Sequence, residues 1–101
     1  MTVREKRIAF SKAIAELVIW ANEQGFEACF DREGQQHMKN SLHYKGLAKD
    51  IILYRNGEYL THSDEYRPLG DKWKSLSPLA RWGGDFPGDG NHFSFEHDGV
   101  K

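Results

Sequence analysis

The spacing of apolar residues in the first quarter of the chain predicts one long amphipathic helix over residues 4–24. Apolar side chains recur at helical spacing, and charged side chains lie on the opposite side; the apolar positions are Phe10, Ile14, Leu17, Val18 and Ala21. Gly25 follows directly, as is typical of the residue just beyond a helix C-terminus. We expect this helix to be a scaffold that packs against a sheet.

Alternation of apolar and polar residues predicts strands in the middle of the chain. Residues 26–30 alternate and predict a short strand, and the alternation is stronger over residues 47–54. Asn56 and Gly57 are typical of a tight hairpin turn. Residues 58–61 are therefore expected to form the return strand of a hairpin.

The last third of the chain predicts a second helix and a final strand. Residues 62–69 are expected to form a loop, and the apolar spacing over residues 69–82 predicts a helix that Pro78 shortens or kinks. Residues 91–97 alternate again and predict a strand. This order of elements predicts the α+β class, with a small antiparallel sheet and flanking helices in a single domain over residues 1–101.

Composition and charge exclude several classes of protein. The 14 Lys and Arg residues nearly balance the 15 Asp and Glu residues, which argues against a strongly basic nucleic-acid binder. The longest apolar run, residues 17–20, is far shorter than a membrane span. Residues 1–7 are charged and no signal-peptide core follows, so we expect cytoplasmic synthesis. We also expect a monomer. The single cysteine, Cys29, excludes an internal disulfide, and we expect its thiol to be buried.

An aspartate inside an apolar strand is the first candidate for chemistry. Asp50 shares a strand face with Ala48 and Ile52, where an ionised carboxylate is costly unless it is paired or binds a metal. The alternative is an edge strand on which Asp50 faces water. His43 lies seven residues earlier, too far for both side chains to reach one ion on a helix. A turn through residues 44–46, however, would bring His43 back beside Asp50.

A second histidine and a second acid complete a candidate metal site. His92 begins the final predicted strand, and Asp89 lies three residues before it. Together with His43 and Asp50, His92 would provide three nitrogen and oxygen ligands, and zinc sites with three protein ligands keep a fourth position for water. Asp89 would then act beside that water as general base and acid. The chain contains no His-Glu-x-x-His motif, no phosphate-binding glycine loop and no Gly-x-Ser-x-Gly motif.

Two sequence blocks carry a resemblance to a known family. Residues 41–50 have the form S-x-H-x-x-G-x-A-x-D, and the second block combines residues 81–86, RWGGDF, with residues 89–93, DGNHF. Together they closely resemble the D-Ala-D-Ala carboxypeptidase/L-alanyl-D-glutamate endopeptidase family of zinc peptidases, which includes many bacteriophage endolysins. The resemblance extends over roughly residues 26–98.

The resemblance implies a fold, a cofactor and a catalytic residue. The implied fold is the compact α+β fold shared with the Hedgehog signalling domain. The implied cofactor is Zn²⁺, with His43, Asp50 and His92 as its ligands. Asp89 matches the acidic catalytic residue of the family, three positions before the last ligand.

The resemblance also implies two contacts with the substrate. Ser41 matches a position near the substrate, with an ordinary turn hydroxyl as the alternative reading. Many members hold substrate carboxylate or carbonyl groups with an arginine that precedes the Ser-x-His block. In this chain the stretch is short, and Arg32 and Gln36 are its possible counterparts.

These expectations lead to one functional hypothesis and one alternative. The hypothesis is a zinc-dependent peptidase that cleaves peptide stems of bacterial peptidoglycan, as a phage lysis-type endopeptidase or a D-Ala-D-Ala carboxypeptidase. Its partner is the peptidoglycan stem peptide, and it would act on the cell wall after release. The alternative is a non-catalytic, metal-stabilised module that binds cell-wall peptide or a partner protein. A His/Asp metal nuclease is disfavoured because no basic track accompanies the site.

Overall fold

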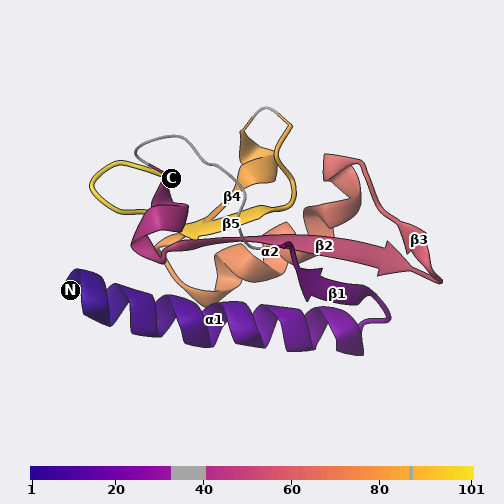
Figure 1. Cartoon of the computed structure of the whole chain (residues 1–101), viewed down its shortest axis with the longest axis horizontal. Helices are drawn as coiled ribbons and strands as arrows, with labels where there is room; N and C mark the ends of the chain where they lie inside the picture. The colour runs from indigo at the N-terminus through magenta and orange to yellow at the C-terminus, as the bar shows by residue number, and fades with distance from the viewer. Residues whose placement is uncertain (33–40, 87) are drawn as a thin grey trace.

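A computed structural model describes residues 1–32, 41–86 and 88–101. Within these ranges the chain combines two α-helices and short 3₁₀-helices (η) with an antiparallel sheet, which confirms the predicted α+β class. Figure 1 shows the long helix α1 running along the length of the sheet. The elements in chain order are α1 (Val3–Glu23), β1 (Glu27–Phe30), η1 (Leu42–Lys45), β2 (Ala48–Arg55), β3 (Glu58–Tyr59), η2 (Ser63–Tyr66), α2 (Arg67–Leu76), β4 (Ala80–Trp82), η3 (Gly83–Asp85) and β5 (His92–Phe95).

Helix α1 confirms the predicted first helix to within one residue at each end. A capping box begins it: the Thr2 hydroxyl accepts the Glu5 N–H at 3.1 Å, and the Glu5 carboxylate accepts the Thr2 N–H at 2.8 Å. Just beyond the helix, Gly25 has φ +94°, a conformation that favours glycine. The buried side of α1 consists of predicted apolar positions, which are Phe10, Ile14, Leu17 and Ala21.

The sheet has the strand order β1-β2-β5-β4, with β3 paired to the far end of β2. Every pair is antiparallel, and Asn56 and Gly57, with φ +52° and +79°, form the predicted hairpin turn. The return strand is shorter than expected, because only Glu58–Tyr59 is assigned to β3. Since β2 lies between β1 and β5, the alternative that places Asp50 on an edge strand facing water is wrong.

The helix predicted over residues 69–82 is wrong at both ends. Helix α2 begins at Arg67, with a proline in its first turn, so the loop expected over residues 62–69 is also wrong. The helix ends at Leu76, because the residue before Pro78 is disfavoured in helical conformation and Ser77 is extended. Residues 80–82 then form β4 against β5. Ala80 and Trp82 are buried on either side of the less buried Arg81, an alternation that suits a short strand, and pairing with β5 decides for the strand.

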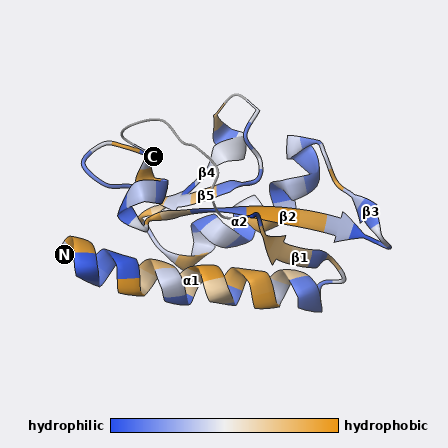
Figure 2. Cartoon of the chain, viewed as in Figure 1, coloured by the Kyte–Doolittle hydropathy of each residue, from blue (hydrophilic) through white to orange (hydrophobic). Residues whose placement is uncertain are grey.

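The core lies between one face of the sheet and the two helices. Trp73 of α2 packs edge-on against Phe10 and Phe93 and stacks on Phe95, with ring centroids 5.4–6.2 Å apart. Its indole N–H donates to the backbone carbonyls of Arg81 at 3.0 Å and of Ser94 at 3.1 Å. Figure 2 shows that apolar residues concentrate on α1, β1 and β2.

Two further sequence expectations concern burial and membranes. The prediction that the Cys29 thiol is buried is wrong, because Cys29 lies exposed on the edge strand β1. No helix in the part of the chain that the structure describes is both long and apolar enough to cross a bilayer.

Candidate metal centre

The fold brings the three predicted ligands together from three separate elements. His43 comes from η1, Asp50 from β2 and His92 from the start of β5. Asp50 and His92 are direct cross-strand partners, which places both side chains on the same face of the sheet. The Asp50 Oδ1 atom lies 3.5 Å from His43 Nε2 and 3.6 Å from His92 Nδ1. One ligand atom from each residue lies within 4.8 Å of the other two.

Local sequence explains how His43 reaches Asp50. The Ser41 hydroxyl caps η1 by accepting the His43 N–H at 3.2 Å. Gly46 then adopts the left-handed conformation, with φ +70°, and turns the chain into β2. The predicted turn through residues 44–46 is therefore present, and Ser41 stabilises the segment that carries the histidine. A contact between Ser41 and substrate stays a prediction.

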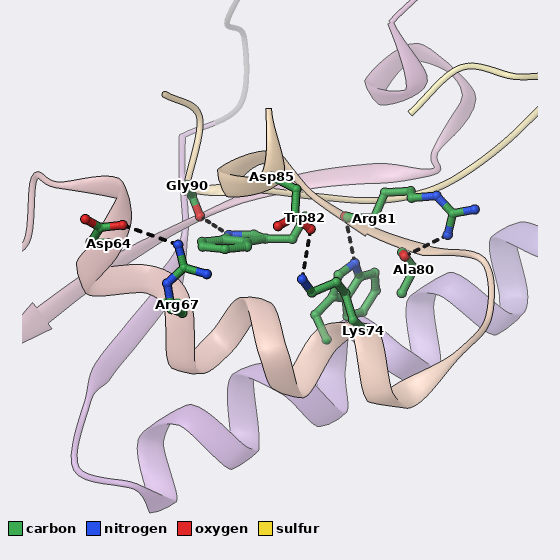
Figure 3. Close-up of polar contacts among 9 residues, drawn as sticks. Asp64, Arg67, Lys74, Ala80, Arg81, Trp82, Asp85 and Gly90 are labelled. Carbon is green, nitrogen blue, oxygen red and sulfur yellow. Dashed lines mark hydrogen bonds and ion pairs between the residues drawn. The ribbon is translucent and has the colours of Figure 1, made fainter. Parts of the chain in front are cut away.

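The turn that carries Asp89 and His92 is held from two sides. Within it, the His92 N–H donates to the Asp89 carbonyl at 3.1 Å. The Trp82 indole N–H donates to the Gly90 carbonyl at 2.7 Å, as Figure 3 shows, and the Gly90 N–H donates to the Ser63 hydroxyl at 3.0 Å. The turn is thus connected to β4, which precedes it closely in the chain, and to η2, which lies 27 residues before Gly90.

Trp82 can hold this turn because glycines leave room for its ring. A Cβ atom added at Gly70 of α2 or at Gly84 of η3 would overlap the indole. The Arg67 guanidinium and the Lys74 ammonium lie 5.2 and 5.6 Å from the ring centroid, so cations also pack against the ring. The sequence pattern did not reveal this role of Trp82, although the adjoining Gly83-Gly84 pair is a signal of close packing.

The separations around Asp50 fit the coordination shell of a metal better than hydrogen bonds. A charged N–H···O hydrogen bond is about 2.7–2.9 Å long. In a tetrahedral zinc site with bonds of 2.0–2.1 Å, neighbouring ligand atoms are about 3.3–3.4 Å apart. The observed distances of 3.5 and 3.6 Å are close to this separation of zinc ligand atoms. Two nitrogens with one carboxylate oxygen also form a known zinc donor set. The three residues can therefore hold a metal ion.

The electrostatics of the cluster favour a cation. The side chains of His43, Asp50 and His92 are only 12–16% exposed. Partial burial raises the pKa of the Asp50 carboxyl, but interactions with the His43 and His92 imidazoles lower it more. The pKa of Asp50 therefore lies far below its usual range, and the carboxylate is ionised at neutral pH.

Two further predicted site residues, Asp89 and Arg32, do not belong to this cluster. Asp89 is exposed, and its carboxylate is not one of the three grouped ligands. Arg32 is exposed just beyond β1 and lines a groove of about 620 Å³ that reaches His43 and Asp50. Gln36 lies outside the described residues.

No protein-family model matches the chain, and no curated protein matches it. The geometry of the site and the two sequence blocks are therefore the basis on which a function can be inferred.

Proposed function

We propose that the protein is a zinc-dependent peptidase that cleaves the peptide stems of bacterial peptidoglycan. It would act on the cell wall after release, as a phage lysis-type endopeptidase or a D-Ala-D-Ala carboxypeptidase, on a Hedgehog/peptidase-like variant of the α+β fold. The observation that carries the proposal is the convergence of His43, Asp50 and His92, since the sequence blocks that resemble the peptidase family supply all three.

The donor set favours zinc over harder cations. Mg²⁺ and Ca²⁺ prefer sites built from oxygen ligands, whereas imidazole nitrogen suits zinc and other transition metals. When bound, zinc supplies Lewis acidity, which polarises a carbonyl group and lowers the pKa of water. Three protein ligands are the arrangement of catalytic rather than closed structural zinc sites.

Asp89 is the proposed general base and acid. Its carboxylate is exposed on the turn whose backbone hydrogen bond joins Asp89 to His92. In hydrolysis, water attacks the carbonyl carbon and the C–N bond breaks. The Asp89 carboxylate would take the proton from the water and deliver it to the leaving amine. Arg32 or a backbone N–H would stabilise the oxyanion, and Ser41 would contact the substrate.

Hydrolysis of cell-wall sacculi tests the proposal. Protein loaded with zinc should release new free amines, and chelation by EDTA should stop the release. Asp89→Ala should keep one bound zinc per chain while hydrolysis falls by at least about 100-fold, the usual scale of general acid–base catalysis. Asp71→Ala, at an exposed acid on α2, is the matched control and should hydrolyse normally. Unchanged hydrolysis by Asp89→Ala would remove Asp89 from the mechanism.

A non-catalytic, metal-stabilised module is the second candidate. The observation in its favour is that Asp89 is exposed and lies outside the cluster of ligand atoms. Such a module would bind cell-wall peptide or a partner protein. In the same assay it would be retained on sacculi without release of amines. If amines are released, mass analysis of the fragments separates endopeptidase from carboxypeptidase action.

A further inference from the structure

A groove beside the candidate metal centre is lined by positive charge from three parts of the chain. It has a volume of about 620 Å³ and reaches from His43 and Asp50 to helix α1. Among the described residues, its cations are Arg7 of α1, Arg32 after β1 and Lys49 of β2, and its carboxylates are Asp31 and Asp50. The sequence pattern indicated only Arg32 among these cations, because the long helix was interpreted as a scaffold.

Arg7 is held beside the segment that carries His43. Its aliphatic stem lies over Gly46, where an added Cβ would be 2.9 Å from the Arg7 Cδ atom. Gly46 ends η1, three residues after His43. The glycine therefore allows the arginine side chain to lie against the end of η1, in the groove that reaches His43 and Asp50, while Arg7 itself is exposed.

Lys49 provides a second cation next to an exposed aromatic ring. Its Nζ atom lies 5.4 Å from the centroid of the Phe30 ring, which is 44% exposed. Lys49 directly precedes Asp50 in β2, so its side chain lies on the opposite face of the sheet from the Asp50 carboxylate, on the side where α1 packs. Within residues 1–32, 41–86 and 88–101, neither Lys49 nor Arg7 forms an ion pair with a carboxylate. Both cations are thus available to an anion that enters the groove.

We propose that Arg7 and Lys49 form an anion subsite that binds a carboxylate of an acidic peptide. The identity of this ligand rests on the proposed peptidase function, in which a peptide lies across the metal centre. The exposed rings of Phe30 and Tyr44, which line the same groove, would contact apolar parts of the peptide. Arginine and lysine bind carboxylates through charge-assisted hydrogen bonds, so an amidated peptide would lose this contact.

The test compares Arg7→Gln with Arg4→Gln, which changes an exposed arginine on the same helix outside the groove. Two probes are used: a stem-peptide fragment with free carboxylates and the same fragment with its carboxylates amidated. Hydrolysis by zinc-loaded protein gives KM and kcat. NMR titration of metal-free protein in EDTA gives a dissociation constant that does not depend on catalysis. Lys49→Gln is measured in parallel.

Arg7→Gln should raise the KM and the dissociation constant for the acidic peptide about tenfold with kcat unchanged. Arg7→Gln should leave the KM and the dissociation constant for the amidated peptide unchanged. Lys49→Gln should act in the same direction as Arg7→Gln, and Arg4→Gln should behave as the wild type. Equal effects of Arg7→Gln on both peptides, or no effect on either, would overturn the subsite.

The same measurements separate the two proposals. If the wild type hydrolyses the peptide and Arg7→Gln has no effect, the peptidase function is supported and the anion subsite is rejected. Binding of the acidic peptide that depends on Arg7, without hydrolysis, rejects the peptidase and supports the subsite in a binding module.

Discussion

The indole N–H of Trp82 donates to the backbone carbonyl of Gly90 at 2.7 Å, joining the end of β4 to the turn between Asp89 and His92. Both groups are buried, so the bond is shielded from water. A side chain in the core therefore helps to hold the turn that carries a candidate metal ligand and a candidate catalytic acid. The position of the site depends on packing as well as on the ligands.

Trp82→Phe should weaken both the fold and metal binding. Phenylalanine keeps an aromatic ring but leaves the buried Gly90 carbonyl without its donor, which costs about 1–3 kcal/mol. Urea denaturation of the metal-free protein measures the stability loss, and competition with a chelator measures zinc affinity. An unchanged zinc affinity would show that Trp82 does not position His92.

Gly70→Ala should destabilise the protein even though alanine is the better helix former. Alanine gains about 1 kcal/mol in a helix interior, but its Cβ at this position would overlap the Trp82 ring. We expect a net loss of about 1–3 kcal/mol in the free energy of unfolding. Ser75→Ala, on an exposed position of the same helix, is the control and should change stability by less than about 1 kcal/mol. Equal stability of the two variants would contradict the close packing of Gly70.

Zinc should stabilise the wild type through Asp50. A ligand that binds only the folded state adds about 2.7 kcal/mol when its free concentration is 100 times its dissociation constant. Asp50→Asn keeps the shape of the side chain but removes the charge, so this stabilisation should largely disappear. Thermal denaturation with zinc and with EDTA measures the effect, and Asp71→Asn is the matched control. Full stabilisation of Asp50→Asn by zinc would exclude Asp50 as a ligand.

Tyr66 should make stability depend on pH in the alkaline range. Its hydroxyl donates to the Leu60 carbonyl at 2.9 Å and accepts the Leu53 N–H at 3.2 Å. Burial raises the pKa of Tyr66 above its ordinary value of 10.0. Above pH 10 the unfolded chain therefore loses this proton before the folded protein does, and the stabilisation present below pH 10 falls as the pH rises.

Tyr66→Phe tests this dependence. The variant should be less stable at pH 8, by about 1–2 kcal/mol, because the buried Leu53 N–H loses its acceptor. Its free energy of unfolding should fall less between pH 8 and pH 10.5 than that of the wild type. Tyr44→Phe, at an exposed tyrosine, should keep the wild-type slope. Identical slopes for Tyr66→Phe and wild type would show that Tyr66 does not cause the alkaline loss.

Two serines should respond differently to replacement by alanine. The Ser94 hydroxyl is fully buried and has no hydrogen-bond partner in the described structure, so Ser94→Ala should be neutral or slightly stabilising. Ser63→Ala removes the acceptor of the Gly90 N–H and should cost about 1 kcal/mol. Denaturant midpoints compare the two. A larger loss for Ser94→Ala would mean that its hydroxyl has a role that the structure does not show.

Local patterns in the sequence were sufficient to predict the first helix and the hairpin turn. They were also sufficient to single out the residues that are candidate metal ligands. Helical periodicity and the Asn56-Gly57 turn act over a few residues, so the chain carries these signals locally. The same locality explains the error over residues 80–82. Their conformation depends on hydrogen bonds to β5, which lies ten or more residues further along the chain.

The amino-acid sequence by itself determined the donor chemistry of the site, because only the residue types decide that two imidazoles and one carboxylate are present. The tertiary structure alone decided that Asp50 pairs with His92 on the neighbouring strand, that Trp82 holds the turn before His92, and that Arg7 lines the same groove as His43. Strand pairing and close packing thus bring together residues that lie up to about 40 positions apart in the chain. Such contacts depend on the whole core, which no local pattern of residues specifies.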